Sequence, residues 1–199
     1  MNLSTQESIS SKADERRHDA ITAAINVIAR EGIEAATIRR IANEIGSSTA
    51  TITYYFANKH ELLLASYRKL GEFSSEKFAE TIASDPADLV GYLVAMTAGN
   101  LETMARWRMY IAIWDTSLRD PALAAELQSW TDATLVRIET LIDILAPGWR
   151  DKNDVARRLI ALVQGISVQR LFDQDSWTTD KVHKVLRDEV RLVLRLEVL

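Results

Sequence analysis

The stretch Thr37–Tyr55, TIRRIANEIGSSTATITYY, decides how the first third of this 199-residue chain folds. Its first half carries Ile38, Ile41 and Ile45 at spacings of three and four, which places them on one face of a helix. Ala42 lies between them, where a larger side chain would keep a crossing helix away. The pattern therefore predicts a short helix that packs closely against a second one.

A turn and a second helix follow within a few residues. Gly46 stands where a tight turn between two helices needs a positive φ, which a residue with a Cβ adopts poorly. Ile52, six residues later, supplies an apolar plug between the helices. A small residue, a glycine and a plug at these spacings predict a helix-turn-helix, the motif that places its second helix in the major groove of DNA.

The second helix of this motif has short or hydrogen-bonding side chains. Methyl and hydroxyl groups suit thymine methyls, base edges and phosphate oxygens, and the absence of bulky charges lets the backbone approach a groove. A helical hairpin with a polar exposed face is the alternative, since the same geometry occurs in proteins that bind no DNA. The residues concerned are Ser48, Thr49, Ala50, Thr51, Thr53 and Tyr54.

Apolar spacing of three and four recurs almost throughout the chain, and no segment alternates as a strand does. We expect capping at Ser11 with Asp14, at Asn58 with Glu61, and by an aspartate before each of the prolines 86 and 121. The expected helices cover 12–31, 37–46, 48–55, 58–83, 120–146, 153–172 and 179–197. The fold class is all-α: a three-helix helix-turn-helix domain over 1–57 on a larger helical body over 58–199.

Composition limits the classes of protein. The chain has 47% hydrophobic and 26% charged residues, no cysteine, and no apolar run long enough to cross a membrane. Its first residues lack the apolar core of a signal peptide, so we expect a cytoplasmic protein. Residues 1–69 carry nine Lys and Arg against eight Asp and Glu, and residues 70–199 carry 15 against 20. An acidic body under a neutral-to-basic end could face an acidic polymer at that end.

The first 65 residues resemble the DNA-binding domain of the TetR family of transcriptional regulators, through AAINVIAREGIEAATIRRIANEIGSSTATITYYFANKHELL. The matching features include the helix-ending Gly32, the turn at Gly46, and Lys59 followed by Leu62. Many family members have a tyrosine where this chain has Thr53, and a small hydroxylated residue there is more like the BetI-type branch. The segment WRMYIAIWDTSLRDPALAAELQSW, residues 107–130, resembles the BetI-type ligand-binding domain.

The resemblance implies a symmetric homodimer that binds a palindromic double-stranded DNA operator as a repressor and is released by a small-molecule effector. Lys12, Arg16 and Arg17 are either further phosphate contacts or a solvated basic end. By position, the residues that would face DNA are Thr37, Arg39, Ser48, Thr49, Thr51, Tyr54, Tyr55 and Lys59.

The body carries a stripe of large apolar residues. Met104, Trp107, Ile111 and Trp114 recur on one helix face, and Trp130 follows on the next helix. They form either plain core or the wall of a ligand cavity, where tryptophan faces could also hold a quaternary ammonium group. Possible polar partners in such a cavity are Tyr110, Asp115, Gln164 and Gln169.

The last two helices are the candidates for dimerisation. Gly165 lies in the middle of one, where it costs about 1 kcal/mol relative to alanine, and close approach of a neighbouring helix would justify it. The alternative is that both helices only close the core of the monomer. The expected interface residues are Leu159, Leu162, Val163, Ile166, Val182, Val185, Leu186, Val190 and Val193.

Other classes of function lack support in the sequence. His18, His60 and His183 are scattered, and neither a metal-binding HExxH motif nor a glycine-rich phosphate loop occurs. We therefore expect no enzyme, no cofactor and no metal site. A helical protein–protein adaptor that keeps the motif without binding DNA stays open. For the regulator, we expect the long helix from Asn58 to transmit effector binding by tilting.

Overall fold

The computed structural model describes the backbone of residues 3–196 and the side chains of residues 14–196, and within these limits it contains helices and no strand. A 3₁₀ turn, η1 (Ile33–Ala35), separates the first two helices. The α-helices are α1 (Leu3–Glu31), α2 (Ile38–Glu44), α3 (Thr49–Tyr55), α4 (Lys59–Ser84), α5 (Leu89–Ala95), α6 (Leu101–Ser117), α7 (Pro121–Leu145), α8 (Lys152–Arg170) and α9 (Thr179–Leu194). The all-α prediction is confirmed.

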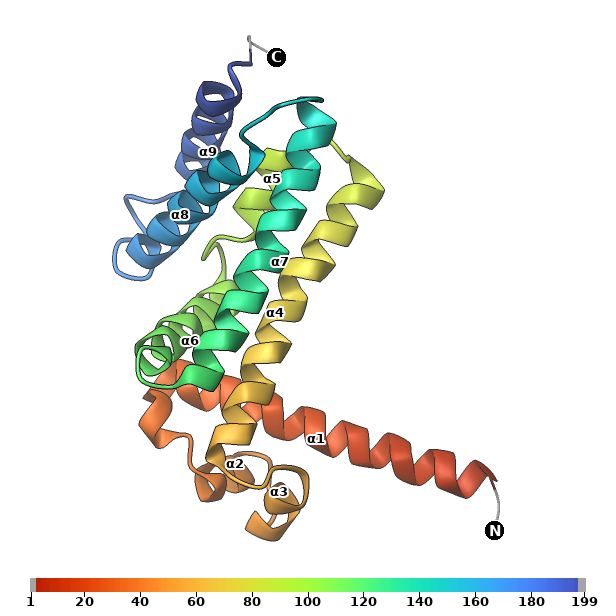
Figure 1. Cartoon of the computed structure of the whole chain (residues 1–199). Coiled ribbons are helices and arrows are strands. Elements are labelled where there is room, and N and C mark those ends of the chain that lie inside the picture. The colour runs from red at the N-terminus through yellow and green to blue at the C-terminus, as the bar shows by residue number, and fades with distance from the viewer. Residues whose placement is uncertain (1–2, 197–199) are drawn as a thin grey trace.

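The chain builds an elongated molecule with the helix-turn-helix at one end (Figure 1). α2 and α3 lie at the bottom of the view, and α1 passes over them. α4 runs from this end along most of the body, beside α7, while α6 lies across the lower part of the body. α8 and α9 pack together on the opposite side of the body from α4. The long α4 thus joins the two ends of the molecule.

The helix-turn-helix forms for the reasons that the sequence indicated. Thr37 and Ser48 cap α2 and α3 through their side-chain oxygens, which accept from backbone N–H groups three residues on. Gly46 takes a φ of 62°, the left-handed conformation that the turn needs. Ile41 and Ile52 are fully buried between the helices.

Two apolar cores lie along the molecule, and α6 contributes to both. The lower core joins α1, α2, α3 and the start of α4, and it includes Met109 and Ile113 of α6. The upper core joins α5, α7, α8 and α9, and it includes Met104 and Trp107 from other faces of α6. A displacement of α6 therefore reaches the packing of the helix-turn-helix directly.

Several predicted helix ends differ from the structure. α1 begins at Leu3, so Ser11 lies inside the helix and is not a cap. Asp85 does not start a helix either: it ends α4, and Asp88 caps α5 by accepting from the N–H of Gly91. The Asp-Pro pattern failed there because the chain first makes a turn, in which Asp85 accepts from the N–H of Ala87.

The other predicted ends agree closely. The Asn58 cap of α4 and the Asp120 cap of α7 are confirmed, as is the break after α7, where Gly148 has a φ of 81°. α9 ends at Leu194, before the predicted end at Glu197, because Arg195 adopts the left-handed conformation. Glu197 itself lies outside the described residues.

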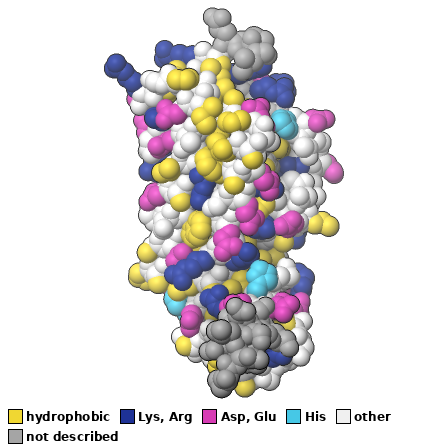
Figure 2. Space-filling model, turned by 90° about the vertical axis from the view of Figure 1, so that its right-hand side faces the viewer, with side chains coloured by type: hydrophobic (Ala, Val, Ile, Leu, Met, Phe, Trp, Pro, Cys, Tyr) yellow, Lys and Arg dark blue, Asp and Glu magenta, His cyan; other side chains and the backbone are white. Residues whose placement is uncertain are grey.

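The side of the body on which α4 and α7 lie is shown in Figure 2. Acidic and basic side chains intermingle over the lower half of this view, and apolar side chains form a strip along its upper half. Exposed apolar side chains of α7 include Val136, at 61%, and Ile144, at 41%.

Candidate functional site

The outer surface of α3 is polar and open to solvent. Tyr54 is 80% exposed, and its ring contacts Tyr55 edge to face at a centroid distance of 5.0 Å. Tyr55 is half-buried and packs on the lower core, so it supports Tyr54 more than it projects itself. Thr49 is exposed, and the Thr51 hydroxyl lies 3.0 Å from Ser48 Oγ within the cap.

Basic side chains flank this surface. Arg39 is exposed on α2 and forms no ion pair with any residue that the structure describes. Lys59 is half-buried at the start of α4, with its Nζ 3.5 Å from a carboxylate oxygen of Glu34. Arg17 lies over the ring of Phe56, 5.2 Å from the centroid, at the end of α3. Arg16 is exposed, and the side chain of Lys12 lies outside the described residues.

The neighbouring Arg40, unlike Arg39, forms ion pairs within the protein. Its guanidinium bonds Glu31 of α1 at 2.7 Å and Glu44 of α2 at 2.6 Å, and Arg30 also bonds Glu44 at 2.8 Å. The side-chain bonds to these arginines lower the pKa of both glutamates. Arg40 therefore ties α2 to α1 and holds the motif together, while Arg39 is available to an external anion.

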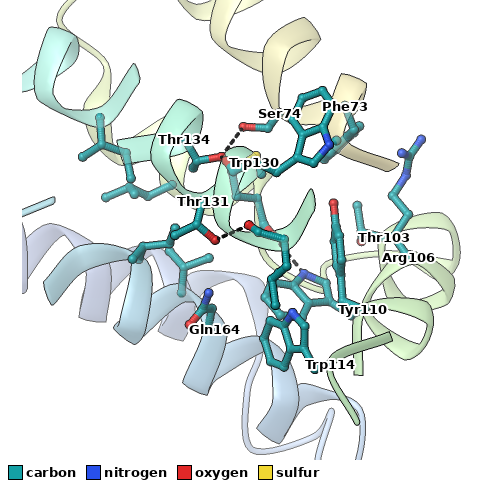
Figure 3. Close-up of a pocket in the computed structure, with 18 of the residues that line it drawn as sticks. Phe73, Ser74, Thr103, Arg106, Tyr110, Trp114, Trp130, Thr131, Thr134 and Gln164 are labelled. Carbon is teal, nitrogen blue, oxygen red and sulfur yellow. Dashed lines mark hydrogen bonds between the residues drawn. The ribbon is translucent and has the colours of Figure 1, made fainter. Parts of the chain in front are cut away.

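The body contains a cavity of about 90 Å³ between α4, α5, α6, α7 and α8. Its wall is mainly aromatic, with scattered hydroxyl and amide groups (Figure 3). Of the predicted pocket residues, Trp107, Tyr110, Trp114 and Trp130 line it, as does Gln164 of α8. Residues that sequence reasoning did not assign to a cavity include Tyr67 and Phe73 of α4, Tyr92 of α5, Arg106 of α6 and Val163 of α8.

Met104 and Ile111 were predicted to line a pocket and do not line this cavity. Met104 is buried in the upper core, and Ile111 is half-buried. The cavity face of α6 holds Thr103, Trp107, Tyr110 and Trp114. At about 100° per residue, the centre of this face is rotated by about 70–90° from Met104 and Ile111. Likewise Asp115 pairs with Arg119, outside the cavity.

Hydrogen bonds fix the aromatic wall. The Tyr110 hydroxyl donates to the Leu70 carbonyl of α4 at 3.1 Å, and Trp107 Nε1 donates to the Met96 carbonyl at 3.0 Å. Burial raises the pKa of Tyr110 to about 12, and it also raises that of Tyr67. Both phenols are therefore neutral near pH 7 and supply dipoles to the cavity rather than charge.

Trp130 connects the cavity to α4. A Cβ added to Gly71 would lie 2.4 Å from the Trp130 ring, so the indole packs directly on the backbone of α4. Trp130 Nε1 donates to Glu126 Oε1 at 3.1 Å, and Glu126 Oε2 accepts from Arg68 Nη2 of α4 at 2.9 Å. The Arg68 guanidinium lowers the pKa of Glu126, which keeps that carboxylate ionised.

The predicted dimer residues divide into two groups. Six of them, Leu159, Val163, Ile166, Val182, Leu186 and Val190, are buried in the upper core of a single chain, so their side chains are closed to a partner. The stripe of each helix that is richest in apolar residues thus faces the core of the single chain. Leu162, Val185 and Val193 stay half-buried.

The outward face of α8 and α9 has apolar residues of its own. Phe172, just after α8, is 83% exposed, and Leu192 of α9 is 66% exposed. Gly165 and Ala161 lie on the exposed side of α8, and a Cβ added to Gly165 would meet no atom within 4 Å. Packing within one chain therefore gives no reason for this glycine.

The described residues offer neither a metal site nor a membrane span. Among the described residues, no group of three or more His, Asp or Glu side chains is arranged to hold a metal ion. No helix in this part of the chain is long and apolar enough to cross a membrane.

Comparison with known sequences decides the family. Residues 20–66 match the family described as "Bacterial regulatory proteins, tetR family". Residues 86–195, more than half of the chain, match "BetI-type transcriptional repressor, C-terminal". The chain belongs to the TetR family. It is a transcriptional regulator with a BetI-type body, as the resemblance in the sequence implied.

Relatives agree over nearly the whole length. The chain is 27% identical over 181 residues to the transcriptional regulator BetI of Vibrio atlanticus (strain LGP32), covering 88% of this chain and 90% of the relative. It is 29% identical over 193 residues to a nicotine-responsive transcriptional repressor of Paenarthrobacter nicotinovorans, covering 88% and 92%. A transcriptional regulator from Saccharomonospora viridis, solved in complex with choline, superimposes with a TM-score of 0.76 at 24% identity, covering 89% and 96%.

Proposed function

We propose that this TetR-family chain acts as a homodimeric repressor that binds a palindromic DNA operator through α3 and is released when a small molecule enters the cavity. The observation that carries the DNA part is the outer surface of α3, where Tyr54 stands 80% exposed beside exposed threonines on a well-capped helix-turn-helix. Short polar side chains and one projecting tyrosine fit a major groove. Arg39, Lys59 and Arg17 surround this surface with cations for phosphates.

In this proposal, residues 1–57 form the DNA-binding domain, and residues 58–199 form the body that binds the ligand and the second subunit. We assign Thr37, Ser48 and Thr51 chiefly to holding α2 and α3 in place, since their oxygens serve the caps or bond to a cap residue. Exposed side chains such as Thr49 and Tyr54 make the contacts with base edges and phosphates.

The dimer interface lies on the outward face of α8 and α9. Exposed Phe172 and Leu192, half-buried Leu162 and Val185, and the open surface at Gly165 support this assignment. A glycine lets a partner helix approach closely, which would offset its cost in the helix. A two-fold axis through this face presents two α3 helices to one duplex, as half-sites about 34–36 Å apart require.

The size of the cavity supports the link between ligand and DNA. Ligand pockets usually measure about 300–1,000 Å³, and a void of about 150 Å³ already holds benzene. The cavity here has about 90 Å³, so its walls must move apart to admit even one ring. Two of the five helices that line the cavity lead to the helix-turn-helix. α4 begins there, and α6 packs in the lower core through Met109 and Ile113.

Movement of these walls would be transmitted to the DNA-binding domain by two routes. Expansion tilts α4, to which Trp130, Glu126 and Arg68 connect α7, and it shifts α6 against α1 and the helix-turn-helix. A ligand with higher affinity for the expanded form then lowers operator affinity, by at most the factor of its preference between the two forms. The relatives that respond to nicotine or contain choline support a small-molecule effector here.

Other classes find less support. Membership of a family of transcriptional regulators argues against an enzyme, and the three histidines of the sequence lie on α1, α4 and α9, well separated. A protein–protein adaptor would need no cations around α3. Salt dependence separates these classes, because binding that neutralises phosphates weakens steeply as salt rises.

The test is selection of binding sites from a random duplex library with the purified protein. We expect an enriched palindrome, bound by a dimer, with an affinity that falls steeply with salt. Arg39→Ala and Lys59→Ala should each lower the slope of log K against log salt by about one. Arg108→Ala, at an exposed position on α6 away from both α3 and the proposed dimer face, is the matched control. Absence of any enriched site at low salt would refute the DNA part and leave the adaptor.

A further inference from the structure

The charge of the cavity wall distinguishes between classes of effector. Arg106 is the only charged side chain among the described residues that line the cavity, and no carboxylate joins it. Arg137 of α7 lies beside the same wall, where it donates to the hydroxyl oxygens of Ser74 and Ser75 at 3.4 and 2.5 Å. The lining itself therefore contributes a positive charge and no negative one, which favours an anion over a cation.

Arg106 is only partly satisfied by the protein. Its Nη2 donates to Glu102 one turn earlier on α6, at 2.6 Å, but that carboxylate is on the surface, with 69% of its side chain exposed. The Nε of Arg106 is buried and has no hydrogen-bond partner in the described part of the chain. Buried donors normally have a partner, so an acceptor brought by a ligand would satisfy this one.

One aromatic ring of the cavity wall, that of Phe73, already contacts cationic side chains of the protein. The Arg106 guanidinium lies 4.2 Å from the centroid of the Phe73 ring, with Lys77 Nζ at 5.6 Å, so this ring already binds cations. Figure 3 shows Arg106 reaching from α6 towards Phe73 of α4. Trp107 meets Tyr110 and Trp114 edge to face, at centroid distances of 5.5 and 5.9 Å. Such rings present both edges and faces, which suits a further aromatic ring.

We propose that the effector is a small aromatic carboxylic acid, with its ring among Trp107, Trp114 and Trp130 and its carboxylate on Arg106. The identity of the ligand rests on the proposed function, since it concerns the same cavity. The carboxylate takes the Nε–H donor and replaces the exposed Glu102 as the partner of the guanidinium. Quaternary ammonium compounds are then poor ligands for this chain.

The test is calorimetric titration of the wild-type protein with three matched probes: phenylacetate, its neutral amide phenylacetamide, and the cation phenethylamine, with choline as a fourth. We expect phenylacetate to bind about tenfold to hundredfold more tightly than the amide, and the two cations more weakly than the amide. Arg106→Gln should remove the preference for the acid over the amide. Arg108→Gln, an exposed position on the same helix, should keep it.

Tighter binding of phenethylamine or choline than of phenylacetate would overturn the proposal, and so would an unchanged preference in Arg106→Gln. Failure of phenylacetate to bind, with the protein still folded by circular dichroism, would overturn it as well. Titration needs no DNA, so these results are independent of the operator. A protein that binds its operator but not phenylacetate refutes only the ligand class, and one that binds phenylacetate but no DNA refutes the proposed function.

Discussion

Gly71→Ala tests the contact that connects the cavity to α4. The new Cβ would lie 2.4–2.5 Å from three carbon atoms of the Trp130 ring, whereas carbon atoms pack at about 3.5–4.0 Å. The indole must therefore move by about 1 Å, away from α4 and towards the cavity that it lines. The indole is a rigid, half-buried ring and has no flexible end that could bend aside.

The expected magnitude is the difference between two effects. Overpacking of this kind costs about 1–3 kcal/mol, while alanine gains about 1 kcal/mol over glycine inside a helix. The net result is a loss of about 1 kcal/mol, which lowers the melting temperature of a chain of this size by about 2–4 °C. Thermal unfolding followed by circular dichroism measures it.

The same substitution in a Trp130→Leu background provides the control. Without the indole, Gly71→Ala should only gain the higher helix propensity of alanine and raise the free energy of unfolding by about 1 kcal/mol. The sign of its effect on stability therefore reverses. Stabilisation of equal size in both backgrounds would show that Trp130 does not pack on Gly71, and it would refute this route from cavity to α4.

Three further predictions concern the ion pair between α4 and α7, the dimer interface, and stability at acid pH. Glu126→Gln should keep effector affinity but reduce the fall in operator affinity on effector binding, because the charge pair with Arg68 is lost; fluorescence anisotropy measures both. Phe172→Glu should shift sedimentation towards the monomer, whereas Val136→Glu, at an exposed position on α7 outside the proposed interface, should not. Arg40 lowers the pKa of Glu31, and Arg30 together with Arg40 lowers that of Glu44, so these glutamates contribute fully to stability above the ordinary value of 4.5 and lose that contribution as the pH falls through the lowered values. Arg40→Gln should therefore make unfolding, followed by circular dichroism, less dependent on pH in that acid range.

The helix-turn-helix could be predicted because its information is local. Gly46, the caps at Thr37 and Ser48, and the plug at Ile52 act within a few residues of one another, so their spacing defines both helices and the turn. The exposed side of α3 followed from the same periodicity. Arg40 has a local partner in Glu44, four residues on, but its ion pair with Glu31 of α1 depends on how the two helices pack and could not be predicted from the sequence.

The cavity and the dimer face depended on tertiary packing. The stripe from Met104 to Trp114 was found, but only the position of α4 and α7 around α6 decides which side of that stripe meets empty space. Both apolar stripes of α8 and α9 were found, yet apolar residues at helical spacing do not say whether the core or a partner covers them. Gly165 is a stronger basis for the proposed interface, because no atom of the single chain lies within 4 Å of a Cβ added there.

The central claim is that α3 reads an operator, and Tyr54 tests it most directly. The wild type and Tyr54→Ala would be titrated by fluorescence anisotropy onto the selected operator and onto a scrambled duplex at the same salt concentration. Tyr54 is exposed, so its replacement should leave the fold intact. The account predicts that the variant loses about tenfold or more in affinity for the operator and little for the scrambled duplex. An unchanged preference for the operator over the scrambled duplex would contradict it.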